Sequence, residues 1–340
     1  MKLVQVKTGS WPTDMKPEIS LKNIREAHQR IVSHIHRTPI MSSAGINEIA
    51  GCSIYFKCEN FQKVGAFKAR GGINAVLSLP PEELKNGVTT HSSGNHAQAI
   101  ALAARIAGTR AYIVMPENAP KVKIQAVEAY GAEIIFCEST LDARESTVEE
   151  VIRKTNAKFI HPYNDERIIA GQATAAVELI EDLNKENIKL DYLLAPVGGG
   201  GLLSGSSLSS HYLNPEGKVI GCEPEGADDA YRSFKEGRLI PQTNPQTVAD
   251  GLRTSLGEKT FALISEYVDD ILLATDEQTI QAMKLIWQRM KILVEPSCAV
   301  PLAALLSRPE SFVAKNVGII LSGGNVDINP VLSGTQLRFE

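Results

Sequence analysis

The sequence predicts an α/β fold of two domains, with mostly parallel sheets flanked by helices. Short apolar segments alternate along the chain with amphipathic segments of helical period. The alternation pauses at residues 162–167 and then resumes. A chain of 340 residues also exceeds one ordinary hydrophobic core. We predict a small domain of residues 87–165 set into a large domain of residues 1–86 and 166–340.

The N-terminal part predicts a helix, a strand and a second helix. Ser20 can cap the first helix, whose apolar residues recur at helical spacing and which ends before Thr38-Pro39. The segment 53–59 alternates as a strand does, and a helix opens near Lys68. The apolar face of the first helix consists of Leu21, Ile24, Ala27 and Ile31.

Strand and helix then alternate in close order. Strands joined by single helices pair in parallel with right-handed crossovers. The predicted strands of the small domain are residues 87–91, 110–116, 133–137 and 157–161, and its helices are residues 95–108, 120–131 and 141–154.

The remaining chain repeats this pattern and adds one interruption. Residues 237–251 are rich in Pro, Gly, Asn and Gln, and we predict a loop there. Two helices precede the last strand. The other predicted elements are helices from about 169 to 184 and from the glycine run to about 212, and strands 192–197, 218–223, 270–274 and 316–324.

Composition points to a cytoplasmic protein that acts on small molecules. Basic and acidic residues nearly cancel, 35 against 39, and no basic stripe predicts nucleic-acid binding. The N-terminus lacks the apolar core of a signal peptide, and no apolar run reaches membrane-spanning length, so no membrane partner is expected. Widely spaced cysteines without a CxxC pair indicate reduced thiols: Cys52, Cys58, Cys137, Cys222 and Cys298.

Four consecutive glycines, residues 198–201, lie between a predicted strand and a helix. Glycine lets backbone N–H groups approach an anion closely, and a helix N-terminus favours negative charge, so this loop predicts a phosphate site. A nucleoside-triphosphate loop requires a Lys-Ser/Thr pair after its glycines, and this loop has none. A dinucleotide site is an alternative, because Glu223 ends the next strand where a ribose-binding acid would stand, but the GxGxxG spacing is not met.

Three other strand ends and turns carry reactive side chains. In "HSSGNHAQA" the backbone amides could hold a carboxylate and a serine could move a proton, although a simple helix cap is an alternative. Ser322 follows the last strand, and Lys68 stands beside apolar Phe67 in a glycine-rich turn. Pyridoxal 5′-phosphate (PLP) needs a lysine for a Schiff base, a phosphate cradle and a partner for its ring nitrogen. These residues together predict a PLP site.

The motifs "FQKVGAFKARG", "SSGNHAQA", "PVGGGGLLSG", "VEPSCAV" and "LSGGN" occur in one order along nearly the whole chain. In this respect the chain resembles the fold-type II PLP enzymes (tryptophan synthase β-like) of the serine racemase and serine/threonine dehydratase group. The resemblance implies β-elimination of L-serine or L-threonine to a 2-keto acid and ammonia, together with serine racemase activity. An L-threo-3-hydroxyaspartate ammonia-lyase is an alternative, whereas a nucleotide-binding oxidoreductase or a non-catalytic binding module fits these residues less well.

The resemblance also implies roles for individual residues. Lys68 would carry the cofactor and act as the base on one face of the substrate, and Ser93 would be the second base, unless it only caps the helix. A neutral serine at the pyridine nitrogen would leave that nitrogen largely unprotonated, which suits elimination. The expected cofactor-binding residues are Phe67, Lys68, Asn95, Gly198, Gly199, Gly200, Gly201, Leu202 and Ser322.

The same resemblance extends to substrate, metal and partner. Arg144 is expected on the substrate side, a surface salt bridge being the alternative, and Tyr163 stands where animal racemases have a smaller polar residue. Mg²⁺, or Mn²⁺ or Ca²⁺, would bind an oxygen site, an exposed acidic turn being the alternative. The chain would form a homodimer. The expected substrate-binding residues are Ser92, Asn95, His96 and Arg144, and the expected metal ligands are Glu223, Ala227 and Asp229.

Overall fold

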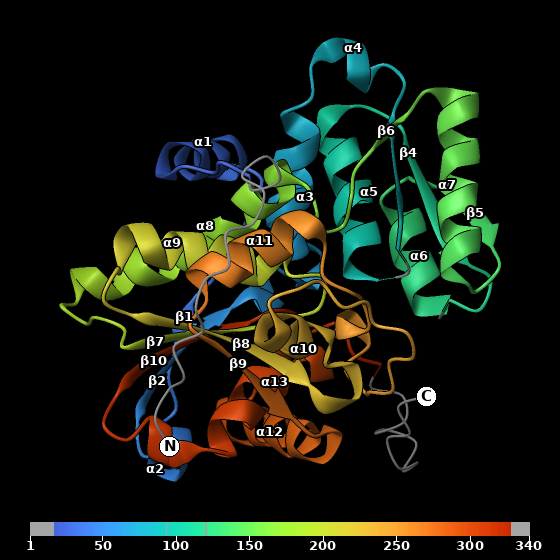
Figure 1. Cartoon of the computed structure of the whole chain (residues 1–340). Coiled ribbons are helices and arrows are strands. Elements are labelled where there is room, and N and C mark those ends of the chain that lie inside the picture. The colour runs from blue at the N-terminus through green and yellow to red at the C-terminus, as the bar shows by residue number, and fades with distance from the viewer. Residues whose placement is uncertain (1–16, 93, 120, 328–340) are drawn as a thin grey trace.

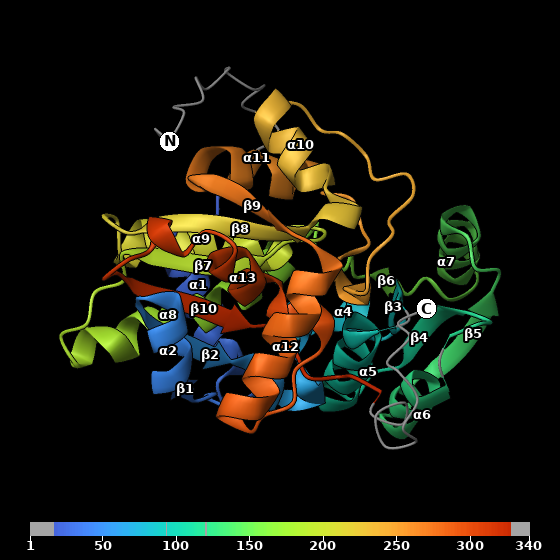
Figure 2. The same cartoon turned by 90° about the horizontal axis from the view of Figure 1, so that it is seen from below.

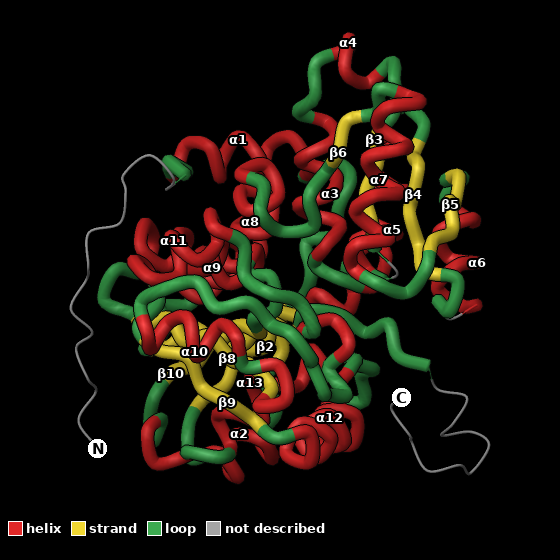
Figure 3. Tube along the Cα trace, turned by 45° about the vertical axis from the view of Figure 1, so that its right-hand side comes forward, coloured by secondary structure: helices red, strands yellow, loops and turns green. Residues whose placement is uncertain are grey.

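The computed structural model describes residues 17–92, 94–119 and 121–327, and within them the chain forms two separate sheets (Figures 1 and 3). The larger sheet has six strands in the order β1-β2-β10-β7-β8-β9. All neighbours pair in parallel except β1 and β2, which are antiparallel. The strands are β1 (Ile40–Met41), β2 (Ser53–Cys58), β7 (Tyr192–Pro196), β8 (Lys218–Pro224), β9 (Asp270–Ala274) and β10 (Asn316–Leu321).

The smaller sheet has four parallel strands in the order β5-β4-β3-β6. Its strands all fall within residues 88–159, whereas those of the larger sheet come from residues 40–58 and 192–321. The predicted α/β fold with mostly parallel sheets is therefore confirmed, and the domain limits stay a prediction. The strands are β3 (Val88–His91), β4 (Ala111–Pro116), β5 (Glu133–Cys137) and β6 (Lys158–Phe159).

Helices cover both faces of the larger sheet (Figures 1 and 2). α8 and α9 pack on one face, and α13 with α2 and α12 lies on the other. No helix among the described residues is both long and apolar enough to cross a bilayer. The helices are α1 (Leu21–Ile31), α2 (Ala44–Ala50), α3 (Lys68–Leu77), α4 (Pro81–Leu84), α5 (Asn95–Ala107), α6 (Lys121–Ala129), α7 (Leu141–Thr155), α8 (Glu166–Lys185), α9 (Gly201–Leu213), α10 (Asp229–Glu236), α11 (Glu258–Tyr267), α12 (Asp276–Met290) and α13 (Pro296–Leu306).

α1 forms as its sequence predicts. The Ser20 hydroxyl accepts the N–H of Asn23, whose side chain in turn accepts the N–H of Ser20, so that the first turn is capped from both sides. Ile24, Ala27 and Ile31 are fully buried because their spacing places them on one face. The predicted cap is confirmed, and so is the apolar face for these three residues, whereas Leu21 in the first turn is only half-buried.

Several short elements were not predicted from the sequence. β1 has only two residues, and α2 and α10 have seven and eight, which is too short for a clear period. α10 is nevertheless held by buried Ala230 and Phe234, four residues apart, and ends at Gly237. β6 covers two residues where five were predicted. Tertiary packing sets these lengths, and local pattern does not reveal it.

Glycines allow α3, α8 and α9 to touch along their backbones. A Cβ at Gly171 of α8 would lie 2.6 Å from the Cα of Gly71 in α3, and one at Gly205 of α9 would lie 2.6 Å from the Ala173 nitrogen in α8. Real Cβ atoms do not come so close, so only glycine fits at these crossings. The first turns of α3 and α9 are therefore held in register by the helix between them.

Candidate active site

Lys68 is the first residue of α3 and follows a strained turn. Val64 and Gly65 both have left-handed backbone angles, φ 56° and φ 67°, and the first of these is unfavourable for a β-branched side chain. The Phe67 N–H donates to the Ser322 carbonyl at 3.0 Å, which ties the turn to the end of β10. This bond places the Ser322 backbone at the lysine turn, and the residue itself is buried.

The Lys68 amine has no carboxylate partner among the described residues. Its Nζ donates to the Pro162 carbonyl at 2.8 Å and lies 5.2 Å from the centre of the Phe67 ring. Burial lowers the pKa of this amine to about 8. An amine with so low a pKa is partly neutral near pH 7 and can attack an aldehyde, which the solvated ammonium of an ordinary lysine does poorly.

The glycine run forms the entry to α9. Gly200 has φ 87°, and a Cβ there would lie 2.8 Å from both Leu256 and Thr260. The Thr260 hydroxyl donates to the Gly199 carbonyl at 2.8 Å and fixes the loop. Because the first N–H groups of a helix have no partner within it, this loop presents free donors at the positive end of α9. The arrangement fits a phosphate.

Pro162 and Tyr163 connect the lysine to the glycine loop. The Pro162 carbonyl accepts from Lys68, while a Cβ on Gly199 would collide with the Tyr163 ring. His161 packs edge-on against that ring at 4.6 Å, and its Nδ1 accepts the N–H groups of residues 163 and 164. One short segment before α8 therefore brings the two predicted parts of the site together, although they are about 130 residues apart in the sequence.

A substitution at Gly200 tests the phosphate cradle. In Gly200→Ala the methyl group would meet Leu256 and Thr260, and the φ of 87° is unfavourable for alanine. We expect a cost of about 1–3 kcal/mol, seen as a Kd for PLP raised by about tenfold or more. Gly108→Ala is the matched control, because Gly108 also has a positive φ, 67°, but no atom within 4 Å of its Cβ position. Equal PLP affinities in the two variants would argue against the cradle.

Asn95, at the first turn of α5, has both of its polar atoms in a partly buried network. Its Nδ2 donates to Glu295 Oε1 at 2.9 Å, and its Oδ1 accepts from Asn325 Nδ2 at 2.8 Å. Asn325 also donates to the Val64 carbonyl at 2.7 Å and fills the space beside Gly65. The network leaves Asn95 one free N–H for a ligand, and it joins α5 to the lysine turn.

Glu295 and Asn325 were not identified from the sequence. Glu295 lies in "VEPSCAV", where it reads as a residue before a helix-opening proline, and nothing local shows that its carboxyl turns toward Asn95. Burial, followed by the charge of Asp250, raises the pKa of Glu295 to about 8. The carboxyl is therefore protonated and neutral at pH 7, next to a residue expected to hold the cofactor.

The raised pKa makes stability depend on pH. Between about 4.5, the ordinary value, and about 8, the folded state keeps a proton on Glu295 that the unfolded state releases, so this group lowers the free energy of unfolding as pH rises. Glu295→Gln mimics the protonated form. In urea titrations of cofactor-free protein, we expect its stability relative to the parent to increase from pH 5 to pH 7.5. A difference that does not change with pH would contradict this, and Glu310→Gln, at an exposed position, serves as the control.

The other residues predicted to bind the substrate or to move its proton lie in the same part of the chain as Asn95, except for Arg144. His96 is buried, its pKa lies well below the ordinary value because of burial and the Lys68 charge, and its Nε2 lies 3.4 Å from the Ile160 carbonyl. The Ser92 hydroxyl accepts the Gly94 N–H at 3.2 Å. Ser93, predicted as the second base, lies outside the described residues.

Arg144 is held without a charged partner in the described part of the chain. Its Nε is buried and has no hydrogen-bond acceptor there. After burial, its charge is the next contribution that lowers the pKa of His91, so the guanidinium lies near the carboxyl end of β3. The surface salt bridge considered from the sequence is absent from the described residues, which leaves the guanidinium free for a ligand.

The predicted metal residues lie together at the end of β8. Glu223, Ala227 and Asp229 are fully buried, and Asp229 Oδ1 has no hydrogen-bond partner in the described structure. Glu223 accepts the N–H groups of Ala230 and Tyr231, at 3.0 and 2.8 Å. Burial raises the pKa of Asp229 to about 7 and that of Glu223 well above its ordinary value. No three His, Cys or acidic side chains converge there, or elsewhere in the described ranges.

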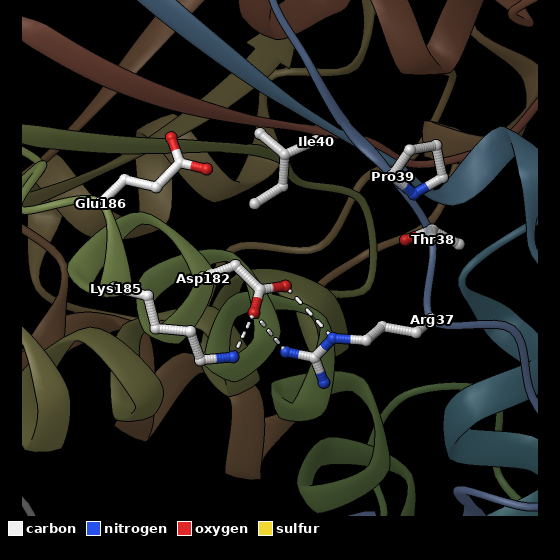
Figure 4. A pocket seen from close by; sticks show the side chains of 7 residues that line it. All are labelled: Arg37, Thr38, Pro39, Ile40, Asp182, Lys185 and Glu186. Carbon is white, nitrogen blue, oxygen red and sulfur yellow. Dashed lines mark hydrogen bonds and ion pairs between the residues drawn. The ribbon is translucent and has the colours of Figure 1, made fainter.

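A surface pocket of about 380 Å³ lies apart from these residues, beside the end of α8 (Figure 4). Asp182 occupies it and accepts from Arg37 at 2.6 Å and from Lys185 at 2.8 Å. The two cations are therefore already paired, and we assign no ligand to this pocket.

The described residues fit PLP. An amine of lowered pKa, a glycine loop at a helix N-terminus and a nearby strand-end serine are the groups that this cofactor requires. Lys68 would hold its aldehyde carbon, residues 198–202 its phosphate, Asn95 its hydroxyl and Ser322 its ring nitrogen.

Comparison with known proteins agrees with this fit. The chain belongs to the family described as pyridoxal-phosphate dependent enzyme, whose model matches residues 31–323. Within it, the chain is 49% identical to the serine racemase of Dictyostelium discoideum over 92% of this chain and 97% of that one. It is also 49% identical to a beta-hydroxyaspartate dehydratase of Paracoccus denitrificans, over 89% of this chain and 95% of that one. The crystal structure of a threonine deaminase from T.th. superposes with TM-score 0.88 at 41% identity, over 92% and 100%.

These findings confirm three predictions made from the sequence: the family resemblance, the enzyme class and PLP as cofactor.

Proposed function

We propose that the chain catalyses PLP-dependent β-elimination of L-serine or L-threonine to a 2-keto acid and ammonia, and that it racemises serine. The observation that carries the proposal is the Lys68 amine, whose pKa is about 8 and which donates to the Pro162 carbonyl. The next residue, Tyr163, lies against Gly199 of the glycine loop. Serine racemase and threonine deaminase among its relatives support this substrate class.

The residues of the site would have different roles in this reaction. Bound PLP withdraws electrons from the substrate α-carbon and so makes its proton acidic. Lys68, once its amine is free, takes that proton on its own face, because a neutral amine of pKa about 8 is a suitable base near neutral pH. The N–H groups of the segment around Ser92 would hold the substrate carboxylate. Asn95 and Ser322 would orient the cofactor ring, and Tyr163 would close the glycine loop against water.

Ammonia-lyase activity on L-threo-3-hydroxyaspartate is a second candidate. Arg144 favours it, because a buried guanidinium nitrogen without an acceptor would suit a second substrate carboxylate. The similarity to a beta-hydroxyaspartate dehydratase supports the same view.

One experiment separates these activities. Purified protein is incubated with L-serine, D-serine, L-threonine or L-threo-3-hydroxyaspartate, and keto acid and enantiomer composition are followed. Turnover of serine with change of enantiomer supports the first candidate, and a strong preference for hydroxyaspartate supports the second. No turnover of any of the four would reject both.

We also propose a divalent cation at Glu223, Ala227 and Asp229. The Asp229 oxygen without a partner and the proximity of two buried carboxyls support it, because a cation would offset the cost of burying them.

We expect MgCl₂ at a hundred times its Kd to stabilise the parent by about 2.7 kcal/mol. Asp229→Asn should lose most of this gain in thermal unfolding. Asp228→Asn should keep it, because that neighbour pairs with Arg232 at 2.8 Å. No Mg²⁺, Mn²⁺ or Ca²⁺ effect on the parent would reject the site.

We also propose that the chain forms a homodimer and is located in the cytoplasm. Phe61 and Leu293 are 43% and 48% exposed, and Asn60 joins their two loops by a hydrogen bond of 3.1 Å to the Leu293 carbonyl, which supports a face for a second copy. The five cysteines are free and buried, which supports a reducing compartment. Light scattering on the purified chain tests the first of these proposals.

A further inference from the structure

A cluster of four charged side chains is buried beneath the first turn of α3. Arg70 and Lys57 supply two positive charges, and Glu59 and Glu178 two negative ones, and all four side chains are at most 1% exposed. The Arg70 guanidinium binds Glu59 through Nε and Nη2, at 2.7 and 2.8 Å, and Glu178 through Nη1 and Nη2, at 2.9 and 2.8 Å. Every nitrogen of the guanidinium is used.

Stability alone does not account for such a cluster. Taking charges out of water costs free energy that their mutual attraction only partly returns, so buried ion pairs are often no better than apolar side chains of equal volume. What a guanidinium adds is geometry, because its planar fork binds two carboxylates in only one orientation. The cluster therefore fixes an orientation, and Arg70 lies only two residues after Lys68 on the same helix.

The cluster joins α3, the helix that begins at Lys68, to two other elements. Arg70 belongs to α3, Glu59 follows β2, and Glu178 lies on α8 (Figure 1). α8 begins just after the segment whose Pro162 carbonyl accepts from Lys68. At the crossing of α3 with α8, the Gly71 N–H also donates to Gln172 Oε1 at 3.1 Å.

Further contacts hold the carboxylates in place. Lys57 Nζ donates to Glu178 Oε2 at 2.7 Å and to the Thr38 carbonyl at 2.8 Å. The Thr38 hydroxyl donates to Glu59 Oε1 at 2.5 Å. Neither carboxylate can turn without breaking bonds to a second element, so the position that they impose on Arg70 is stiff.

We propose that Arg70, Glu59 and Glu178 are positioning residues that set the rotation of α3 against α8 and so place the Lys68 amine for its reaction. This inference rests on the proposed role of Lys68. The three side chains do not themselves touch the reacting atoms. If the cluster positions the amine, loosening it should slow the chemistry of Lys68 more than it weakens substrate binding.

The test uses Arg70→Lys, which keeps the charge and removes the fork. Cofactor is stripped from the full chain, PLP is added back, and the rate of covalent attachment is followed by absorbance. We expect attachment and kcat each to fall at least tenfold, with KM within about threefold of the parent. Thr174→Val is a milder variant, because it keeps Arg70 and both carboxylates. It removes the 3.1 Å bond from Arg70 Nη1 and the 2.7 Å bond from the Thr174 hydroxyl to the Gly171 carbonyl within α8, and we expect a smaller fall in the attachment rate and in kcat.

Two controls on α8 separate positioning from stability. Leu179→Ala removes a fully buried apolar side chain and should lower Tm without slowing attachment. Asp182→Asn breaks the partly exposed ion pair with Arg37, one turn beyond Glu178. It should change neither Tm nor the rate of attachment.

Three results would overturn the proposal or the role on which it rests. Parent rates of attachment in Arg70→Lys, or in Thr174→Val if the first variant does not fold, would reject positioning. Equal slowing in Leu179→Ala would show that general stability is responsible. If borohydride reduction of the parent with PLP labels a lysine other than Lys68, the proposed function fails instead.

Discussion

Lys68→Ala is expected to abolish both turnover and covalent attachment of the cofactor. The variant loses the amine that contacts Pro162, the residue before the Tyr163 ring that lies against Gly199, together with the base for the α-proton. We expect kcat to fall by about 10⁴-fold, the upper end of what one proton-transferring side chain contributes. Borohydride reduction followed by peptide mapping should label Lys68 in the parent and no lysine in the variant.

The same substitution should not unfold the protein. In the cofactor-free parent, burial of the amine lowers its pKa, so keeping it charged costs stability at pH values below about 8. Alanine removes this cost, and we expect a Tm equal to or above that of the parent at pH 7. A Tm several degrees lower would mean that Lys68 has a structural role, and loss of activity would then say nothing of chemistry.

Ser93→Ala is expected to abolish racemisation and to spare much of the elimination from L-serine. Inversion of the α-carbon needs proton removal on one face and delivery on the other, so two groups are required. Elimination from L-serine needs only the Lys68 face. We therefore expect D-serine elimination and enantiomer interconversion to be lost together, measured by chiral chromatography and keto-acid release.

The neighbouring residue supplies the control for that experiment. Ser92 holds the Gly94 N–H, so Ser92→Ala should disturb the loop and lower all serine activities in proportion. Interconversion at the parent rate in Ser93→Ala would exclude this serine as the second base. If the parent does not racemise serine, the enzyme is a dehydratase and Ser93 only shapes the loop.

The sequence predicted those parts of the molecule that depend on local pattern. α1, α5 and the four parallel strands of the smaller sheet follow from periodicity and caps, and Lys68 and the glycine run stand out by residue type in a strand-end loop. The buried network did not stand out. Glu295 and Asn95 are 200 residues apart, Asn325 and Asn95 are 230 apart, and Arg70 and Glu178 are 108 apart. Such contacts depend on tertiary packing, which no short window of sequence records.

Strand order in the larger sheet has a consequence for how the chain is made. β10, the last strand of the described residues, pairs with β2 on one side and with β7 on the other, with Val317 opposite both Ile54 and Tyr192. Until residues 316–321 leave the ribosome, β1-β2 and β7-β8-β9 are separate fragments, each with an unpaired apolar edge. Nascent chains are therefore open to aggregation for most of their synthesis, and the lysine turn, which is bonded to Ser322, closes only when the final strand is inserted.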